Sequence, residues 1–334
     1  MTASSIAKGQ LVTVFGGSGF LGRYVVQTLA RRGLRVRVAV RRPDLAQHLQ
    51  PLGTVGQIHA VQANLRFPES VRAAVQGASA VINLVGILQQ SGRQTFTALQ
   101  TTGAESVARE AAAIGARMIH VSAIGADAES PAQYGQSKAE GEARVMALCP
   151  DAVILRPSIV FGPGDSFFNR FAALARVFPV LPIASAETRF QPVFAGDVAE
   201  AVARAVEGSV QGGRIYELGG PSVYSFRELL EYVLTVTERR RLIAAMPPAL
   251  ARLQASVTET LDRFTFGLMP DEIVLTRDQL LMLERDNVVS PEAHAEGRDL
   301  EGIGITPTTL EAVVPGYLKR FRKHGQYDRR PTAA

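Results

Sequence analysis

The chain has 334 residues, of which 46% are hydrophobic, and its formal net charge is +5. Such a chain can bury a large core. The single cysteine, Cys149, excludes a disulfide framework within the chain and fits a reducing compartment. Residues 1–10 are polar and do not resemble a signal peptide, and no apolar stretch reaches the roughly 18 to 20 residues that span a bilayer. We therefore expect a cytoplasmic protein that does not cross a membrane.

A glycine-rich turn follows the first apolar stretch. Residues 11–15 are predicted to form a strand, and residues 20–32 a helix that ends at Gly33. Of the three glycines between them, the first permits a tight turn, the second lets backbone approach a pyrophosphate, and the third lets the helix pack on the strand. The phosphates then bind at the helix N-terminus. The turn predicts a dinucleotide site that includes Gly16, Ser18, Gly19, Phe20, Leu21 and Gly22.

Further apolar strands alternate with helical stretches. We expect them at residues 34–40, 57–62, 80–84, 118–122 and 152–155. Apolar strands joined by helices predict an α/β fold with a Rossmann-type, doubly wound parallel sheet. From about residue 161, prolines interrupt the pattern. We therefore expect an NADP(H)-binding domain over residues 1–160, to which parts of 190–220 return, and a smaller C-terminal α/β lobe over residues 161–334.

The end of the second strand bears on the choice of cofactor. NAD sites usually have an acidic residue about 20 positions beyond the glycines. This chain has Arg41 and Arg42 there. A carboxylate would repel a 2′-phosphate, whereas a guanidinium group binds it bidentately. We therefore expect NADPH rather than NADH as the cofactor. The alternative is that both arginines only belong to a surface turn.

A serine, a tyrosine and a lysine form the candidate catalytic group. Ser122 ends the fifth expected strand, and Tyr134 and Lys138 lie four residues apart on a helix expected to begin at Ser130 and Pro131. This spacing puts phenol and ammonium on one helix face, where an ammonium charge lowers the pKa of a phenol. The phenol can then exchange a proton with a substrate oxygen to which the serine is hydrogen-bonded. The group therefore indicates acid–base chemistry beside a hydride carrier.

Two basic clusters stand out, at residues 239–241 and 319–324. The first precedes a proline-broken apolar tract, and residues 239–270 together suit a membrane interface with cations facing lipid phosphates. We expect this segment and the basic tail to contact lipid or a membrane-bound partner. The alternative is a solvated charged face and an ordinary packed core. No nucleic-acid reader motif accompanies the charge, and the five histidines lack metal-ligand spacing, so we expect neither nucleic acid nor metal.

The chain has two further motifs beside the glycine turn and the Ser122, Tyr134 and Lys138 group. They are RPSIVFGP at residues 156–163 and ITPTTLE at residues 305–311. With them nearly the whole chain resembles an extended short-chain dehydrogenase/reductase. The resemblance implies that Tyr134 and Lys138 also hold the nicotinamide ribose. It implies further cofactor contacts at Asn64, Leu65, Leu84, Val85, Gly86, Pro157, Ser158 and Ile159. Asn64 departs from the family, which commonly has aspartate there, but an amide can still address adenine.

Four further segments make the resemblance more specific within this superfamily. They are GPGDSFFNRF at residues 162–171, QPVFAGDV at 191–198, LEGIGI at 300–305, and the basic and then apolar segment 239–266. With these the chain is similar to the NADPH-binding accessory subunit family of respiratory complex I. This resemblance implies a mainly structural nucleotide, complex I subunits as partners, and a peripheral location on the cytoplasmic face of the inner membrane.

Three classes of function stay open on the sequence. We favour an NADPH-bound accessory or assembly subunit of complex I. The second class is an active NADP-dependent oxidoreductase or epimerase, which would use Ser122, Tyr134 and Lys138 on a small carbonyl, alcohol or nucleotide-sugar substrate. The third is a regulator that senses NADP(H) and binds a protein partner without chemistry. A regulator that only senses NADP(H) needs the nucleotide-binding residues but no catalytic residues. The presence of Tyr134 and Lys138 therefore disfavours the third class.

Overall fold

The chain folds into two compact units, which we describe separately. The computed structural model describes residues 6–247, 250 and 276–325. The first unit comprises residues 1–158, 195–219 and 289–307, and the second comprises residues 159–194, 220–288 and 308–334. Nothing in the sequence pattern indicated that residues 289–307 belong to the first unit.

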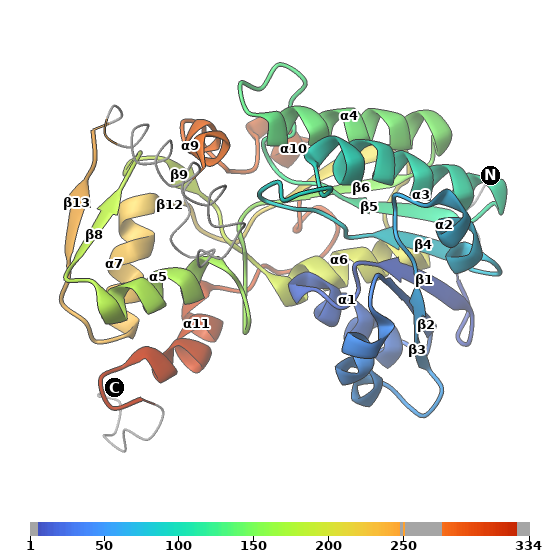
Figure 1. Ribbon diagram of the computed structural model, residues 1–334, viewed down its shortest axis with the longest axis horizontal. Coiled ribbons are helices and arrows are strands. Elements are labelled where there is room, and N and C mark those ends of the chain that lie inside the picture. The colour runs from blue at the N-terminus through green and yellow to red at the C-terminus, as the bar shows by residue number, and fades with distance from the viewer. Residues whose placement is uncertain (1–5, 248–249, 251–275, 326–334) are drawn as a thin grey trace. The chain divides into compact units, whose positions relative to one another are not determined.

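A seven-stranded parallel sheet forms the centre of the first unit (Figure 1). Its strands are β1 (Leu11–Phe15), β2 (Arg35–Val40), β3 (Ile58–Gln62), β4 (Ala80–Asn83), β5 (Arg117–Val121), β6 (Val153–Pro157) and β11 (Arg214–Leu218). They follow the order β11-β6-β5-β4-β1-β2-β3, and each pairing is parallel. The order changes direction between β1 and β4, and sheets of this kind bind ligands there, beyond the carboxyl ends of the strands. The predicted doubly wound parallel sheet is confirmed.

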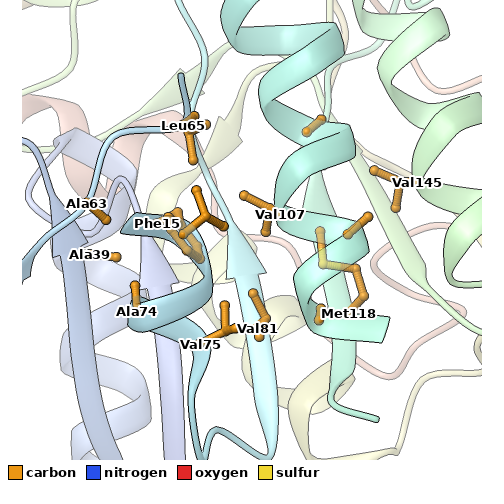
Figure 2. Close-up of a cluster of buried hydrophobic side chains, with 14 of the residues drawn as sticks. Phe15, Ala39, Ala63, Leu65, Ala74, Val75, Val81, Val107, Met118 and Val145 are labelled. Atoms are coloured by element: carbon orange, nitrogen blue, oxygen red, sulfur yellow. The ribbon is translucent and has the colours of Figure 1, made fainter. Parts of the chain in front are cut away.

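Helices cover both faces of this sheet. Figure 1 shows α2 (Pro68–Val75), α3 (Thr102–Ala113) and α4 (Gln133–Leu148) on one face, and α1 (Phe20–Arg31) and α6 (Ala195–Glu207) on the other. Phe15 and Val81 of the sheet share a buried core with Val107 and Val145 of the first group of helices (Figure 2). Because both faces are covered, the central strands β1 and β4 are buried along nearly their whole length.

Helix α4 begins later than the sequence indicated. Its N-cap is Ala132 and its first residue is Gln133, whereas the prediction placed the start at Ser130 and Pro131. Ser130 Oγ accepts a hydrogen bond from Ala132 N (3.2 Å), so this serine closes a local turn before the helix. Serine side chains that bond the backbone two residues on form such turns as readily as helix caps.

The second unit is built from paired short strands and helices. Its strands pair as β7 (Val160–Phe161) with β10 (Val193–Phe194), β9 (Arg189–Phe190) with β12 (Tyr224–Ser225), and β8 (Val180–Ile183) with β13 (Leu242–Ala245). Its helices include α5 (Phe167–Val177), α7 (Phe226–Val236), α9 (Arg277–Met282) and α11 (Leu310–Leu318). Phe168, Phe190 and Phe226 lie in the core of this unit together with Leu310 and Val314 of α11. Across the described ranges of both units, no helix is long and apolar enough to span a bilayer.

The turn between β1 and α1 is built from close backbone contacts. Gly16 has a φ angle of +78°, a left-handed conformation that glycine adopts without strain. A Cβ atom on Gly22 would lie 2.4 Å from Gly16 O and 2.6 Å from the carbonyl carbon of Gly17. No side chain fits there, so the first turn of α1 lies directly on the loop. The predicted tight turn and close helix packing are both present.

Candidate functional site

The carboxyl ends of β1 and β4 hold the glycine turn in place. Leu84 N, directly after β4, donates to Phe15 O (3.0 Å). A Cβ atom on Gly16 would meet Val85 N at 3.3 Å, so the two loops touch through backbone. The predicted cofactor residues of these loops therefore lie at one edge of the sheet: Gly16, Ser18, Gly19, Phe20, Leu21, Gly22, Leu84, Val85 and Gly86.

The N-terminus of α1 suits a phosphate group. Its N-cap is Gly19, which has no side chain to bond the first N–H groups, and no acidic residue lies in the first turn. The dipole of a helix favours an anion at this end. The position of the pyrophosphate stays a prediction, and the N-terminus of α1 leaves its first N–H groups uncapped for it.

The two arginines after β2 differ in their contacts. Arg42 Nη2 lies 3.2 Å from Asp44 Oδ2 in an exposed ion pair, of a kind that contributes little to stability. Arg41 directly follows the last residue of β2, is exposed, and forms no ion pair with any residue that the structure describes. Arg41 is therefore the better placed of the two to bind a phosphate on the ribose.

Asn64 and Leu65 follow β3 and have different surroundings. Asn64 Oδ1 accepts a hydrogen bond from Arg66 N (3.2 Å), which turns the amide oxygen toward its own loop. This leaves Nδ2 as the group that can meet a ligand. The Leu65 side chain is buried in the core of the first unit.

The end of β6 provides the next predicted contact. Pro157 is the last residue of β6, and Ser158 N donates to Leu218 O of β11 (2.9 Å). Ser158 is buried. Because all seven strands are parallel, Pro157 and Ser158 lie at the same sheet edge as the glycine turn. Ile159, the next predicted contact, is the first residue of the second unit.

Ser122, Tyr134 and Lys138 come from the end of β5 and the start of α4. Ser122 is 5% exposed and Lys138 is 4% exposed. The Tyr134 ring meets Phe96 edge-on, with 5.9 Å between ring centroids. Lys138 Nζ lies 5.9 Å from the centroid of the Tyr134 ring, and a Cβ atom on Gly86 would lie 3.2 Å from Nζ. The structure therefore brings Tyr134, Lys138 and the loop after β4 together.

Burial changes the protonation of Lys138. Desolvation lowers the pKa of its ammonium to about 8, against the opposing effect of the Glu142 carboxylate. Glu142 is held by Arg156 through two hydrogen bonds, from Nε to Oε1 (2.9 Å) and from Nη2 to Oε2 (2.6 Å). Lys138 therefore stays mainly protonated at neutral pH but releases its proton more readily than an exposed lysine. Such a lysine can take part in proton transfer.

Two polar pairs beside the site are not predicted from the sequence. Asn83 Nδ2 and His120 Nδ1 lie 3.2 Å apart, and Arg156 binds Glu142 as described above. The available signal was a polar residue near the carboxyl end of each of two neighbouring strands, at positions that pair in register. No signal of this kind links Glu142 to Arg156.

Comparison with known proteins agrees with this geometry. Residues 12–219 match the NAD dependent epimerase/dehydratase family. A relative from Rattus norvegicus, NADH dehydrogenase (ubiquinone) 1 alpha subcomplex subunit 9, mitochondrial, is 34% identical over 325 residues, which cover 96% of this chain and 82% of the relative. The ceramide reductase of Caulobacter vibrioides is 34% identical over 189 residues, which cover 57% of this chain and 58% of that protein.

Among solved structures, an NADPH-dependent quinone oxidoreductase from Escherichia coli, complexed with NADPH, matches this chain with a TM-score of 0.67. Its sequence identity is 19%, and the match covers 92% of this chain and 99% of that one. At this sequence identity, the match shows that the two proteins share a fold and nothing more. The fold of this chain is an NAD(P)-binding fold.

The burial of Lys138 predicts a pH dependence of stability. Between pH about 8 and 10.5, the unfolded chain keeps a proton on this lysine that the folded protein has released, so stability rises with pH across this window. Lys138→Met removes the buried charge with little change of shape. We expect it to be more stable than the wild type at pH 7 by on the order of 3 kcal/mol, with a difference that shrinks above pH about 8.

Urea unfolding from pH 7 to 10 measures this difference. Lys8→Met, at an exposed position, is the matched control for the loss of one cation. If the difference between Lys138→Met and the wild type stays constant over the range, the buried charge is not its cause.

Proposed function

We propose that this chain, which belongs to the NAD dependent epimerase/dehydratase family, is an NADPH-bound accessory or assembly subunit of respiratory complex I. The observation that carries the proposal is the similarity to the rat subunit, which extends over both units rather than over the nucleotide-binding part alone. The first unit binds the nucleotide, mainly as a structural element. The second unit provides the surface for partners.

Copurification tests this role. The full chain, isolated from membranes in mild detergent, is expected to retain NADPH and to bring down NADH:quinone oxidoreductase subunits. Native mass spectrometry identifies the nucleotide and the partners in one measurement. A solitary protein in the soluble fraction would contradict the proposal.

The preference for NADPH rests on Arg41. Its guanidinium follows β2 at the sheet edge where the ribose of the adenosine half lies in folds of this kind. A 2′-phosphate offers this cation a negatively charged acceptor, whereas the 2′-hydroxyl of NADH is uncharged. Arg42 forms an ion pair with Asp44 and therefore contributes less to the preference for NADPH.

Arg41→Ala is therefore expected to weaken NADPH binding roughly 10- to 100-fold, because a hydrogen bond to a charged group contributes about 1.5 to 3 kcal/mol. Binding of NADH should not change. Arg35→Ala, an exposed arginine at the opposite end of β2, is the matched control. Titration calorimetry with both coenzymes measures the effect, and equal losses for NADPH and NADH would remove the assigned role.

The basic clusters predicted from the sequence meet in the second unit. Arg239 Nε donates to Phe321 O and Arg322 Nε donates to Val236 O, both at 2.9 Å. Cations about 80 residues apart in the chain are thus gathered on one unit. Residues 248–249 and 251–270 of the predicted interfacial segment lie outside the described residues.

Exposed apolar side chains adjoin these cations. Val177, Phe178, Val180 and Leu242 are all exposed, and Leu242 lies opposite Val180 where β13 pairs with β8. Arg240 lies two residues before β13 and is exposed. We call these five residues the β8–β13 surface. Apolar side chains beside cations suit an anionic lipid surface, which supports peripheral contact with the cytoplasmic face of the inner membrane.

Phe178→Asp tests this contact. The change removes a large apolar side chain and adds a charge that anionic lipid repels, so binding to phosphatidylglycerol vesicles should fall at least about tenfold. Val55→Asp, at an exposed valine of the first unit, is the matched control. Flotation measures the bound fraction. Equal binding of the wild type to neutral phosphatidylcholine vesicles would count against a lipid surface of this kind.

A second candidate is an active NADPH-dependent reductase. Ser122, Tyr134 and Lys138 lie at the sheet edge and helix face that this chemistry requires, and the similarity to a ceramide reductase adds support. NADPH oxidation that depends on a carbonyl substrate and is abolished by Tyr134→Phe would favour this candidate over a structural coenzyme.

A further inference from the structure

Two polar side chains face each other across two buried strands of the first unit. Asn83 ends β4 and His120 lies in β5, and the two residues pair in register. Both are buried, with His120 1% exposed. Asn83 Nδ2 and His120 Nδ1 lie 3.2 Å apart. Neither residue belongs to the Ser122, Tyr134 and Lys138 group.

The backbone determines which atom of this pair donates. Val85 N–H donates to Asn83 Oδ1 (3.1 Å), and because a backbone N–H can only donate, the amide orientation is fixed. Asn83 Nδ2 then donates to His120 Nδ1, which must accept. The imidazole proton therefore lies on Nε2. Burial and the nearby Lys138 charge lower the pKa of His120 to about 3, so the ring stays neutral.

Two buried polar atoms near this pair lack a partner. Within the described ranges, no protein group is hydrogen-bonded to His120 Nε2 or to Ser122 Oγ. Ser122 N donates to Leu155 O (2.7 Å), so the extended ladder with β6 continues through Ser122. Residues two apart on extended backbone share a face, with Cα atoms about 6.6 Å apart. His120 and Ser122 therefore direct their side chains to the same side of the sheet.

Buried polar atoms without a protein partner are commonly satisfied by buried water. His120 Nε2–H and Ser122 Oγ do not bond each other, so one water molecule placed between them would satisfy both. The water would accept from Nε2–H and donate to Oγ. Because Oγ then accepts a hydrogen bond from the water, the Ser122 O–H points away from the water and is left to donate to another acceptor.

We propose that His120 is a positioning residue that acts on Ser122 through one buried water molecule. The chain of donors then runs from Val85 N–H through Asn83, His120 and the water to the Ser122 hydroxyl, which donates to an oxygen atom of the bound ligand. A carboxamide oxygen of the nicotinamide and the carbonyl oxygen of a substrate share this acceptor chemistry. The identity of the ligand rests on the proposed function. The donor and acceptor roles in this series of hydrogen bonds do not.

The first test needs no ligand. Nitrogen-15 NMR of the imidazoles in the full chain without nucleotide, with His120→Gln used for assignment, should show His120 as a neutral ring protonated on Nε2. Asn83→Asp places a carboxylate against Nδ1 and should move the proton to Nδ1. A wild-type ring protonated on Nδ1 would overturn the inference. This result stands even if the protein binds no NADPH, so it is separable from the proposed function.

The second test is a double-mutant cycle on NADPH affinity by calorimetry. If the acceptor is the nicotinamide carboxamide, His120→Phe should weaken binding roughly three- to tenfold, the range of one hydrogen bond, and should have no further effect in a Ser122→Ala background. His120→Gln, which keeps a donor near the Nε2 position, should restore most of the affinity. His59→Phe, at an exposed position of β3, is the control. Equal losses with and without Ser122 would show a merely structural histidine and overturn the proposal.

Two further ligands identify the acceptor oxygen. If it is the carboxamide, the coupling is present with NADPH and absent with 2′,5′-ADP, which lacks nicotinamide. If it is a substrate carbonyl, the coupling appears only when cyclohexanone is titrated into the NADPH complex. Coupling that persists with 2′,5′-ADP, or that is absent with all three ligands, would overturn the proposal.

Discussion

The close approach of Gly22 to Gly16 is the contact on which the rest of the site depends. With 2.4 Å between Gly16 O and the position of a Cβ on Gly22, any side chain would lift α1 from the loop. The contact sets where the helix begins and aims its uncapped N–H groups over the point where the strand order reverses. Gly16 also meets Val85, and Gly86 in the same loop lies against Lys138. Backbone therefore forms the binding edge, and side chains from β5 and α4 add the chemistry.

Burial decides which polar groups of the first unit are structural and which can act on a ligand. The Glu142 carboxylate and the Arg156 guanidinium satisfy each other through two hydrogen bonds, so they fix α4 against β6. The Ser122 hydroxyl lacks such a partner among the described residues. In native proteins most buried polar atoms are paired, so an exception at the carboxyl edge of a parallel sheet indicates a place that a ligand or water completes. The same reasoning excludes Arg156 as a ligand contact.

The sequence predicted the features that depend on local spacing. The turn at Gly16, the doubly wound parallel sheet implied by alternating strands and helices, and the shared helix face of Tyr134 and Lys138 all follow from residues close in the chain. The start of α4 was placed too early because Ser130 can close a turn as well as cap a helix. Contacts between residues far apart in the chain leave no periodic pattern in the sequence. One of them is the hydrogen bond from Arg298 Nη1 to Ile215 O (2.8 Å), which holds residues 289–307 against β11 and could not be predicted.

A structural role for the coenzyme has a physical basis in Lys138. Burying its ammonium costs stability in the empty protein, and the Glu142 carboxylate offsets only part of that cost because Arg156 already engages both of its oxygens. Oxygen atoms of a bound nucleotide would accept hydrogen bonds from the ammonium and recover the remainder. A ligand that binds only the folded state stabilises it in proportion to its affinity and concentration. A nucleotide bound at the proposed site would therefore couple the stability of this fold to its occupancy, whether or not a reaction also takes place there.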